Sequence, residues 1–174
     1  MQKFESAIIL ILVSATLSSC HPENNRRSEV RKPGKEDMAK LNQYFVEKDR
    51  EIIQSYAERK GLKMTESPTG LWYFIKKQGS GDLFRENEKV SFNYECDLLD
   101  GTKCYSSETS GPKEITIGKS KVEQGLNEGL KLLRPGAEAI FIIPPHLGYG
   151  LIGDGDRIPA RTIIIYDVTI PGNK

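Results

Sequence analysis

A change of pattern near residue 70 sets the strongest limit on what this chain can fold into. From Glu36 to Lys60 the sequence has no glycine or proline, whereas these residues recur from Pro68-Thr69-Gly70 onward. The first stretch can therefore form one long helix, because glycine and proline are the residues that most often end helices. The part after Gly70 is divided into short segments, which is typical of strands joined by tight turns.

The segment 36–60 is predicted to be an amphipathic helix that stops at Gly61, and the helical region is assigned to residues 36–65. Its larger apolar side chains recur every three to four residues, or at twice that interval, with Lys48 as an interruption; they are Met38, Leu41, Phe45, Ile52 and Tyr56. One interpretation is that this stripe packs on the chain's own domain. The other is that residues 36–60 form the contact of a homodimer.

The apolar residues after Gly70 have the spacing of strands around one short helix. Strands are predicted at residues 71–75, 90–99, 102–106, 114–117, 139–143 and 162–170, with Asp100-Gly101 as a two-residue hairpin turn. Ser120 and Glu123 have the spacing of a capping box, which predicts the start of a helix that carries Leu126, Leu130 and Leu133. The predicted fold class is α+β, an antiparallel β-sheet wrapped on one short helix and preceded by the amphipathic helix.

Two glycines and two cysteines constrain the packing further. Gly125 and Gly129 lie one turn apart on the short helix, where each costs about 1 kcal/mol relative to alanine. We expect them to permit a close approach of the helix to the sheet. A two-residue hairpin loop would set Cys96 opposite Tyr105, so that Cys96 and Cys104 would point to opposite faces and would not form a disulfide.

The first twenty residues have the pattern of a bacterial lipoprotein signal. Lys3 precedes an unbroken apolar run over residues 7–13, which is too short to span a bilayer of about 30 Å. Leu17-Ser18-Ser19-Cys20 then resembles a lipobox, whose cysteine becomes the lipidated first residue of the mature chain; an ordinary cleaved signal is the alternative. We predict a signal peptide at 1–19 and a lipoprotein of the cell envelope held on the membrane through Cys20. It faces the periplasm by default, and exposure at the cell surface is left open.

Composition narrows the remaining possibilities. Residues 20–35 are polar and charged and contain two prolines and one glycine, so they are predicted to be a disordered tether. The 25 Lys+Arg nearly balance the 24 Asp+Glu, which gives no reason to expect a nucleic-acid partner. The two histidines and three cysteines do not have the spacing of a zinc site, and neither a metal nor a cofactor is predicted.

From Gly70 to Ile170 the chain resembles the FKBP-type peptidyl-prolyl cis-trans isomerases. The matching segments are Asn93-Tyr94, Leu99-Asp100-Gly101-Thr102-Lys103, Ser106-Ser107, Ile117-Gly118-Lys119, Arg134-Pro135-Gly136, Ile143-Pro144-Pro145, Gly148-Tyr149-Gly150, Ile158-Pro159 and Tyr166-Asp167-Val168. Each segment alone is weak, but their order and spacing together are specific. The tether, the helix and the start at Gly70-Leu71-Trp72-Tyr73 are similar to a branch of bacterial lipoproteins that includes gliding-motility-associated members. The resemblance implies an isomerase domain over residues 66–174.

The resemblance also implies an activity and a site. The protein would assist the folding of exported proteins by rotating their Xaa-Pro bonds, so its partners would be proline-containing segments of those proteins. Such a site needs no nucleophile, base or metal, because the barrier of about 18–20 kcal/mol is amide resonance and a pocket can favour the twisted amide. The catalytic positions of the family fall on Tyr94, Tyr149 and Tyr166, and the substrate-binding positions fall on Cys104, Tyr105, Val122, Glu123, Leu126 and Ile158. Tyr149 is expected to donate to a substrate carbonyl, and Leu126 is expected to be the pocket floor.

Three departures from the family pattern affect this expectation. Cys104 and Tyr105 replace the usual Phe-Asp, which removes an aromatic wall and a buried carboxylate. Glu123 stands where isoleucine is common, and residues 108–113 lack the usual apolar wall residue. We therefore expect reduced or differently selective isomerase activity. The alternatives are a non-catalytic chaperone or assembly-factor binding module on the same fold, and a structural envelope lipoprotein that uses the helix as its contact.

Replacing Cys20 by alanine is expected to release the protein from membranes. Each buried CH₂ of an acyl chain contributes about 0.8 kcal/mol to membrane binding, and the variant can carry no acyl chain at this position. Fractionation of cells that express either form would show the wild type in the membrane pellet and the variant in the soluble fraction. A variant that still sediments with lipid would show that the anchor is assigned wrongly.

Overall fold

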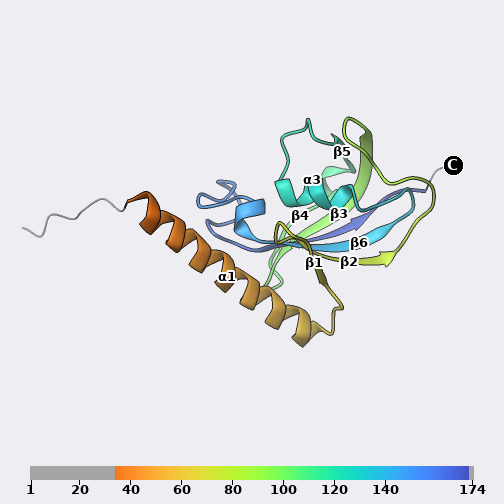
Figure 1. Cartoon of the computed structure of the whole chain (residues 1–174). Coiled ribbons are helices and arrows are strands. Elements are labelled where there is room, and N and C mark those ends of the chain that lie inside the picture. Colours follow the sequence, from red (N-terminus) through yellow and green to blue (C-terminus); the bar gives the residue numbers. More distant parts are fainter. Residues whose placement is uncertain (1–33, 173–174) are drawn as a thin grey trace, which may run out of the picture. The chain divides into compact units, whose positions relative to one another are not determined.

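The computed structural model describes residues 34–172 of the chain. In this part the predicted α+β class is confirmed, because one long N-terminal helix precedes an antiparallel sheet with a short helix against it (Figure 1). The predicted signal peptide, Cys20 and nearly all of the predicted tether lie outside the described residues. Lys35, which was assigned to the tether, is already helical.

The long helix α1 spans Lys35–Lys60 and ends at Gly61, whose left-handed backbone (φ 66°) is the predicted helix stop. The strands are β1 (Thr65–Glu66), β2 (Trp72–Lys77), β3 (Lys89–Leu98), β4 (Lys103–Ser106), β5 (Lys113–Thr116), β6 (Glu138–Ile143) and β7 (Ile164–Thr169). The short helices are α2 (Ser107–Ser110), α3 (Gln124–Leu130) and the 3₁₀ turn η1 (Pro145–Leu147). The sequence did not predict β1, α2 or η1, because they are too short for a periodic pattern.

Strand β3 connects most of the sheet. The strand order is β1-β2-β6-β7-β3-β4, and β5 pairs with the first half of β3. Along β3, Val90, Phe92 and Cys96 are buried and Tyr94 is partly buried, so these four side chains share one face as predicted. This alternation carries Tyr94 to the edge of the core.

Helices α3 and α1 cover opposite faces of the sheet (Figure 1). The larger core includes Leu126 and Leu130 of α3. A Cβ at Gly125 would lie 2.7 Å from Ile143 Cγ2, and a Cβ at Gly129 would lie 2.7 Å from Phe141 Cζ. These distances are shorter than van der Waals contact, so the prediction that both glycines permit close packing of the helix on the sheet is confirmed.

The face of α1 that packs on the sheet coincides only in part with the predicted stripe, because Tyr56 packs on the sheet and Phe45 is half-buried. Ile53 is 1% exposed and packs with Trp72 and Ile142, whereas Met38 and Leu41 are 42% and 43% exposed. The interpretation that the stripe packs on its own domain is therefore wrong for these positions. An ion pair also helps to fix the orientation of α1 on the sheet. The spacing of apolar residues could not predict it, because both of its partners are charged.

That ion pair joins α1 to the loop before β7. The Arg161 guanidinium donates to both carboxylate oxygens of Asp49 at 3.1 Å. The same guanidinium lies 3.7 Å from the centre of the Phe45 ring. Asp49 is only 7% exposed, and burial raises its pKa although Arg161 acts in the opposite direction. A buried carboxylate requires such a partner, so this ion pair holds α1 in one position on the sheet.

The β3–β4 hairpin differs from the prediction by one residue. The Leu98 N–H donates to the Thr102 carbonyl, which leaves residues 99–101 as the loop. Cys96 lies opposite Tyr105 as expected, but Asp97 lies opposite Lys103, because β4 contains a bulge. Cys104 consequently turns into the same core as Cys96, and the prediction that they point to opposite faces is wrong. Both thiols are free.

Candidate functional site

The residues that the family resemblance assigns to a pocket come together near the start of α3. Four of them, Cys104, Leu126, Ile158 and Tyr166, are at most 1% exposed in the larger core. Four more are partly buried and pack against the same core: Tyr94, Tyr105, Val122 and Tyr149. The ninth, Glu123, is 7% exposed and bonds to Tyr166. The nine positions, which lie between Tyr94 and Tyr166 in the sequence, therefore form one cluster in the fold.

A cleft of about 480 Å³ opens over part of this cluster. Its lining residues are Lys113, Lys121, Val122, Glu123, Gln124, Gly148 and Tyr149. The buried residues Leu126, Ile158 and Tyr166 are not among them, so the expected floor of the pocket lies behind the side chains at its mouth. A second cleft, of about 500 Å³, contains Tyr94 but none of the other eight predicted residues; it is lined by Asn93, Tyr94, Glu95, Ser107, Glu108, Asp167 and Thr169.

The cluster contains three tyrosines of the predicted catalytic set: Tyr149 lines the first cleft, Tyr94 lines the second, and Tyr166 is buried. The rings of Tyr94 and Tyr166 have centres 5.8 Å apart. Burial raises the pKa of Tyr94. Burial and the nearby Glu123 carboxylate raise the pKa of both Tyr149 and Tyr166. All three hydroxyls therefore keep their protons at neutral pH and can act as hydrogen-bond donors.

The side chain of Glu123 does not cap α3, so the predicted capping box is wrong. Glu123 is the residue before the helix and forms no side-chain cap. Ser120 Oγ instead accepts from the Thr116 N–H at 2.9 Å, and the Glu123 carboxylate accepts from the Tyr166 hydroxyl at 2.7 Å. The motif failed because the turn after β5 uses Ser120, while a tyrosine distant in sequence offers Glu123 a buried donor. The carboxylate that the family usually has at the position of Tyr105 is absent, but Glu123 supplies a buried carboxylate at another position.

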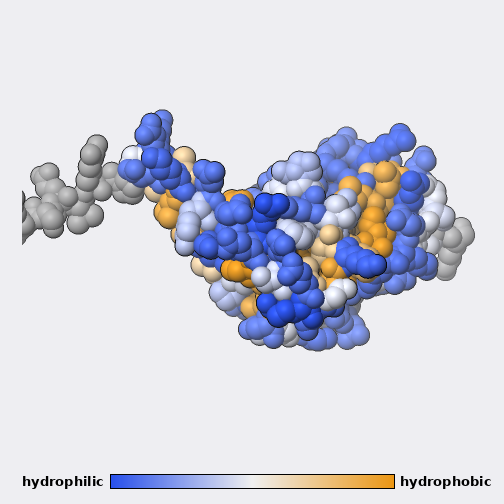
Figure 2. All heavy atoms as spheres, turned by 60° about the horizontal axis from the view of Figure 1, so that its bottom comes forward, coloured by the Kyte–Doolittle hydropathy of each residue, from blue (hydrophilic) through white to orange (hydrophobic). Residues whose placement is uncertain are grey.

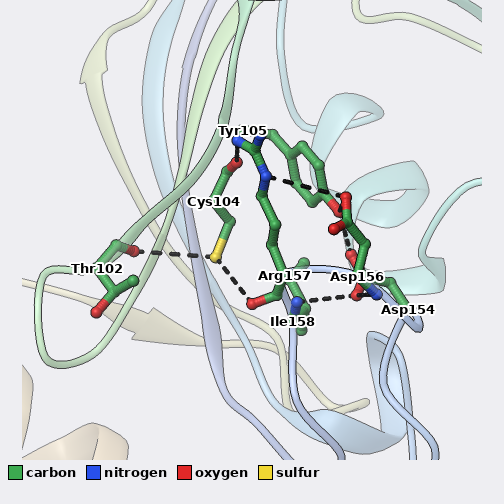
Figure 3. A network of polar contacts seen from close by, with 7 residues as sticks. All are labelled: Thr102, Cys104, Tyr105, Asp154, Asp156, Arg157 and Ile158. Atoms are coloured by element: carbon green, nitrogen blue, oxygen red, sulfur yellow. Dashed lines mark hydrogen bonds and ion pairs between the residues drawn. The ribbon is translucent and has the colours of Figure 1, made fainter.

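Tyr105 belongs to a polar network that joins β4 to the loop after Tyr149 (Figure 3). Its hydroxyl donates to the Asp154 carboxylate, and the Arg157 guanidinium lies 5.5 Å from the centre of its ring. Arg157 also donates to the Cys104 carbonyl at 2.8 Å. The other carboxylate oxygen of Asp154 accepts from the Ile158 N–H at 2.8 Å. We call this set of contacts the rim latch, because it ties Ile158 to the strand that carries Cys104 and Tyr105.

The rim latch shifts the acidities of its two ionisable partners in opposite directions. The hydrogen bond to Asp154 raises the pKa of Tyr105 to about 12. Burial alone would raise the pKa of Asp154, but hydrogen bonds from Tyr105 and from the Asp156 and Ile158 N–H groups lower it. A neutral tyrosine and an ionised aspartate are thus the forms that hold the latch together.

Sequence reasoning missed Asp154, Arg157 and Lys113. The Lys113 ammonium lies 5.6 Å from the centre of the Tyr94 ring, where the expected apolar wall residue is absent. Asp154 and Arg157 lie in a glycine-containing loop. Aspartates in such a sequence predict a turn and give no indication of a partner elsewhere in the fold. The presence of Tyr105 in place of the usual family aspartate was the one sign that this position has a different hydrogen-bond partner. It did not identify that partner as Asp154.

The chemistry of the cluster excludes nucleophilic catalysis by its thiols. Burial raises the pKa of Cys96 to about 12 and also raises that of Cys104, so both stay protonated at neutral pH.

Among residues 34–172, no group of three or more His, Cys, Asp or Glu side chains is placed to hold a metal ion. The same part of the chain contains no helix both long and apolar enough to cross a membrane.

The chain is similar in sequence to known proteins. The sequence model of the family described as FKBP-type peptidyl-prolyl cis-trans isomerase matches residues 81–171. The probable FKBP-type isomerase FkpA of Neisseria meningitidis serogroup B is 38% identical over 124 residues, which cover 71% of this chain and 44% of the relative. FkpA of Escherichia coli K12 is 32% identical, with the same two coverages. The chain thus matches less than half the length of these relatives.

Solved structures agree with the sequence comparisons. The crystal structure of FkpA from Escherichia coli superposes with a TM-score of 0.63 at 30% identity and covers 78% of this chain and 63% of its own. The crystal structure of AtFKBP13 gives a TM-score of 0.59 at 26% identity over 64% of this chain. The family match over residues 81–171, with relatives at 38% and 32% identity, shows that the chain belongs to the FKBP-type peptidyl-prolyl cis-trans isomerase family.

Proposed function

We propose that the protein is a peptidyl-prolyl cis-trans isomerase that assists the folding of exported proteins. The observation that carries this proposal is a cleft lined by Val122 and Tyr149, both of which pack against a core that contains Leu126, Ile158 and Tyr166. Rotation about an Xaa-Pro bond requires a site that prefers the twisted amide over the planar one. Apolar walls that exclude water, together with a few fixed donors, provide that preference.

Each group has a defined part in this mechanism. Tyr149 lines the cleft and keeps its hydroxyl proton, so it can donate to a substrate carbonyl in exchange for its contact with Glu123. The Glu123 N–H forms no hydrogen bond within the described residues and is a second available donor. Val122 lines the apolar side of the cleft. Tyr94, Leu126, Ile158 and Tyr166 form the walls that a proline ring would reach once the side chains at the mouth move aside.

A non-catalytic binding module remains the second candidate, and one observation favours it. The floor residue Leu126 is fully buried and does not line the cleft. A peptide could therefore lie across the mouth, against Val122 and Tyr149, without its proline entering the pocket. Catalysis requires the proline to reach the walls, so turnover measurements separate the two candidates.

Tyr149→Phe is expected to lower kcat/KM for short Xaa-Pro peptides by about three- to tenfold, which corresponds to the loss of one hydrogen bond. The measurement is an isomerisation assay without a coupled protease, on the chain from His21 onward. Tyr73→Phe is the matched control, because the Tyr73 hydroxyl forms no hydrogen bond within the described residues. Absence of turnover in a folded wild-type protein, for several residues before proline, would contradict the enzyme and favour the binding module.

Tyr105→Phe is expected to destabilise the protein fully between about pH 4 and pH 10, and progressively less outside this range. The raised pKa of Tyr105 makes the latch stabilising below about pH 10, and this contribution is lost as the pH rises toward 12. The lowered pKa of Asp154 makes it stabilising above about pH 4, and this contribution is lost at lower pH.

Melting temperatures of the wild type and Tyr105→Phe at pH 3, 7 and 11.5 would test the rim latch. The two proteins should differ most at pH 7 and converge at both extremes. Tyr44→Phe is the control, since Tyr44 lies exposed on α1. A difference that is the same at all three pH values would mean that the Tyr105 hydroxyl does not stabilise the fold through Asp154.

We also propose that the protein is a lipoprotein of the cell envelope and faces the periplasm. This proposal is supported by the apolar run at residues 7–13 and the lipobox-like sequence that ends in Cys20. Its membrane contact is the lipid on Cys20. The tether would then let the domain reach unfolded chains near the membrane surface.

We propose further that the exposed face of α1 forms a homodimer. Five large hydrophobic side chains on this 26-residue helix are at least 41% exposed: Met38, Leu41, Tyr44, Val46 and Ile52. Figure 2 shows hydrophobic surface, in orange, on the first part of α1. A second copy of the same helix would cover such a face and keep it from water.

The double variant Leu41→Lys, Tyr44→Lys is expected to be monomeric by light scattering, whereas the wild type should have twice the mass of one chain. Deleting the whole helix is a poorer test, because Ile53 covers Trp72 and Ile142 and its removal would expose them. Gln54→Lys, at an exposed polar position of the same helix, is the control and should remain dimeric. A monomeric wild type would contradict the dimer.

A further inference from the structure

One oxygen of the Glu123 carboxylate accepts a hydrogen bond, and for the other none is found among the described residues. Its Oε1 accepts from the Tyr166 hydroxyl at 2.7 Å. No hydrogen bond to its Oε2 is found among the described residues, although the Tyr149 hydroxyl lies close enough to this carboxylate for Glu123 to raise the pKa of Tyr149. Because Glu123 lines the cleft although it is only 7% exposed, its carboxylate lies beside the place where a substrate would bind.

No cation of the described residues forms an ion pair with this carboxylate. The eleven ion pairs within 4.0 Å do not include Glu123. Lys113 and Lys121 also line the cleft, but Lys113 lies over the Tyr94 ring and Lys121 is exposed to solvent. The charge of Lys121 is therefore screened by water and that of Lys113 is directed at an aromatic ring, whereas the Glu123 carboxylate is held in a less polar position.

A purely apolar substrate is a poor complement to such a pocket. A proline ring flanked by apolar or acidic side chains would cover the second carboxylate oxygen and remove its remaining water without replacement. A substrate cation beside the proline can instead pair with that oxygen as the water leaves. The position of Glu123 therefore favours one class of substrate over another.

We propose that Glu123 makes the site selective for proline next to a lysine or arginine, and against proline next to an acidic residue. This inference rests on the proposed function, since it concerns the selectivity of the same pocket. Glu123 acts here as a specificity-determining residue, and Tyr166 holds its carboxylate in place.

The test compares peptides that differ only in lysine, glutamine or glutamate, placed directly before or directly after proline. The full-length chain in a mild detergent would be assayed for kcat/KM without a coupled protease. Binding of fluorescent forms of the same peptides would be measured by anisotropy. We expect the wild type to prefer lysine over glutamate about tenfold in at least one of the two positions.

Glu123→Gln keeps the size of the side chain and a possible bond to Tyr166, and it should bring the lysine-to-glutamate ratio close to one. Glu123→Ile serves as a second variant should the first not fold, and it should have the same effect. Glu128→Gln removes one negative charge from the same helix, where Glu128 bonds to Thr69 outside the cleft, and it should keep the wild-type ratio.

An unchanged ratio in folded Glu123→Gln or Glu123→Ile would overturn the proposal while leaving the isomerase intact. Equal reduction of the ratio by Glu128→Gln would also overturn it, because the effect would then follow net charge rather than position. Wild-type protein that neither turns over nor binds any peptide would overturn the proposed function itself, so the two failures are distinguishable.

Discussion

The site depends on how closely α3 can approach the sheet. The two glycines on its inner face leave room for Ile143 and Phe141, whose side chains would overlap any added Cβ. This contact brings the start of α3, with Val122 and Glu123, against the strands that carry Tyr94 and Tyr166. An added Cβ at either glycine would force α3 or these side chains to shift, beside Glu123, whose carboxylate accepts from the Tyr166 hydroxyl at 2.7 Å.

The opposite wall of the site is a loop that is held from more than one direction. The rim latch ties Asp154 and Ile158 to β4 (Figure 3). Arg161 donates its N–H to the Gly150 carbonyl, next to Tyr149, while its guanidinium binds Asp49 of α1. Helix α1 therefore contacts the loop that positions Tyr149 and Ile158, although it lies on the other face of the sheet. The same helix also exposes apolar side chains to solvent. A partner that binds these side chains would therefore contact α1 close to the loop that bounds the pocket.

Much of the fold could be predicted from sequence because strands, turns and helix stops have local signals. The alternation along β3, the stop at Gly61 and the close packing at Gly125 were of this kind. The details that failed depend on partners distant in sequence. Glu123 was interpreted as a cap because Ser120 has the right spacing, and only the fold shows Tyr166 beside it. The orientation of α1 follows from Asp49 and Arg161, which are 112 residues apart.

The most direct test of the central claim is a crystal structure of the protein with a bound Lys-Pro peptide. The account predicts that the proline ring lies among Tyr94, Leu126, Ile158 and Tyr166, that Tyr149 donates to a peptide carbonyl, and that the lysine reaches Glu123. A peptide bound across the mouth of the cleft, with its proline outside these walls, would contradict catalysis at this pocket. A peptide bound in the second cleft, which is lined by residues of β3, α2 and β7, would contradict the assignment of the site.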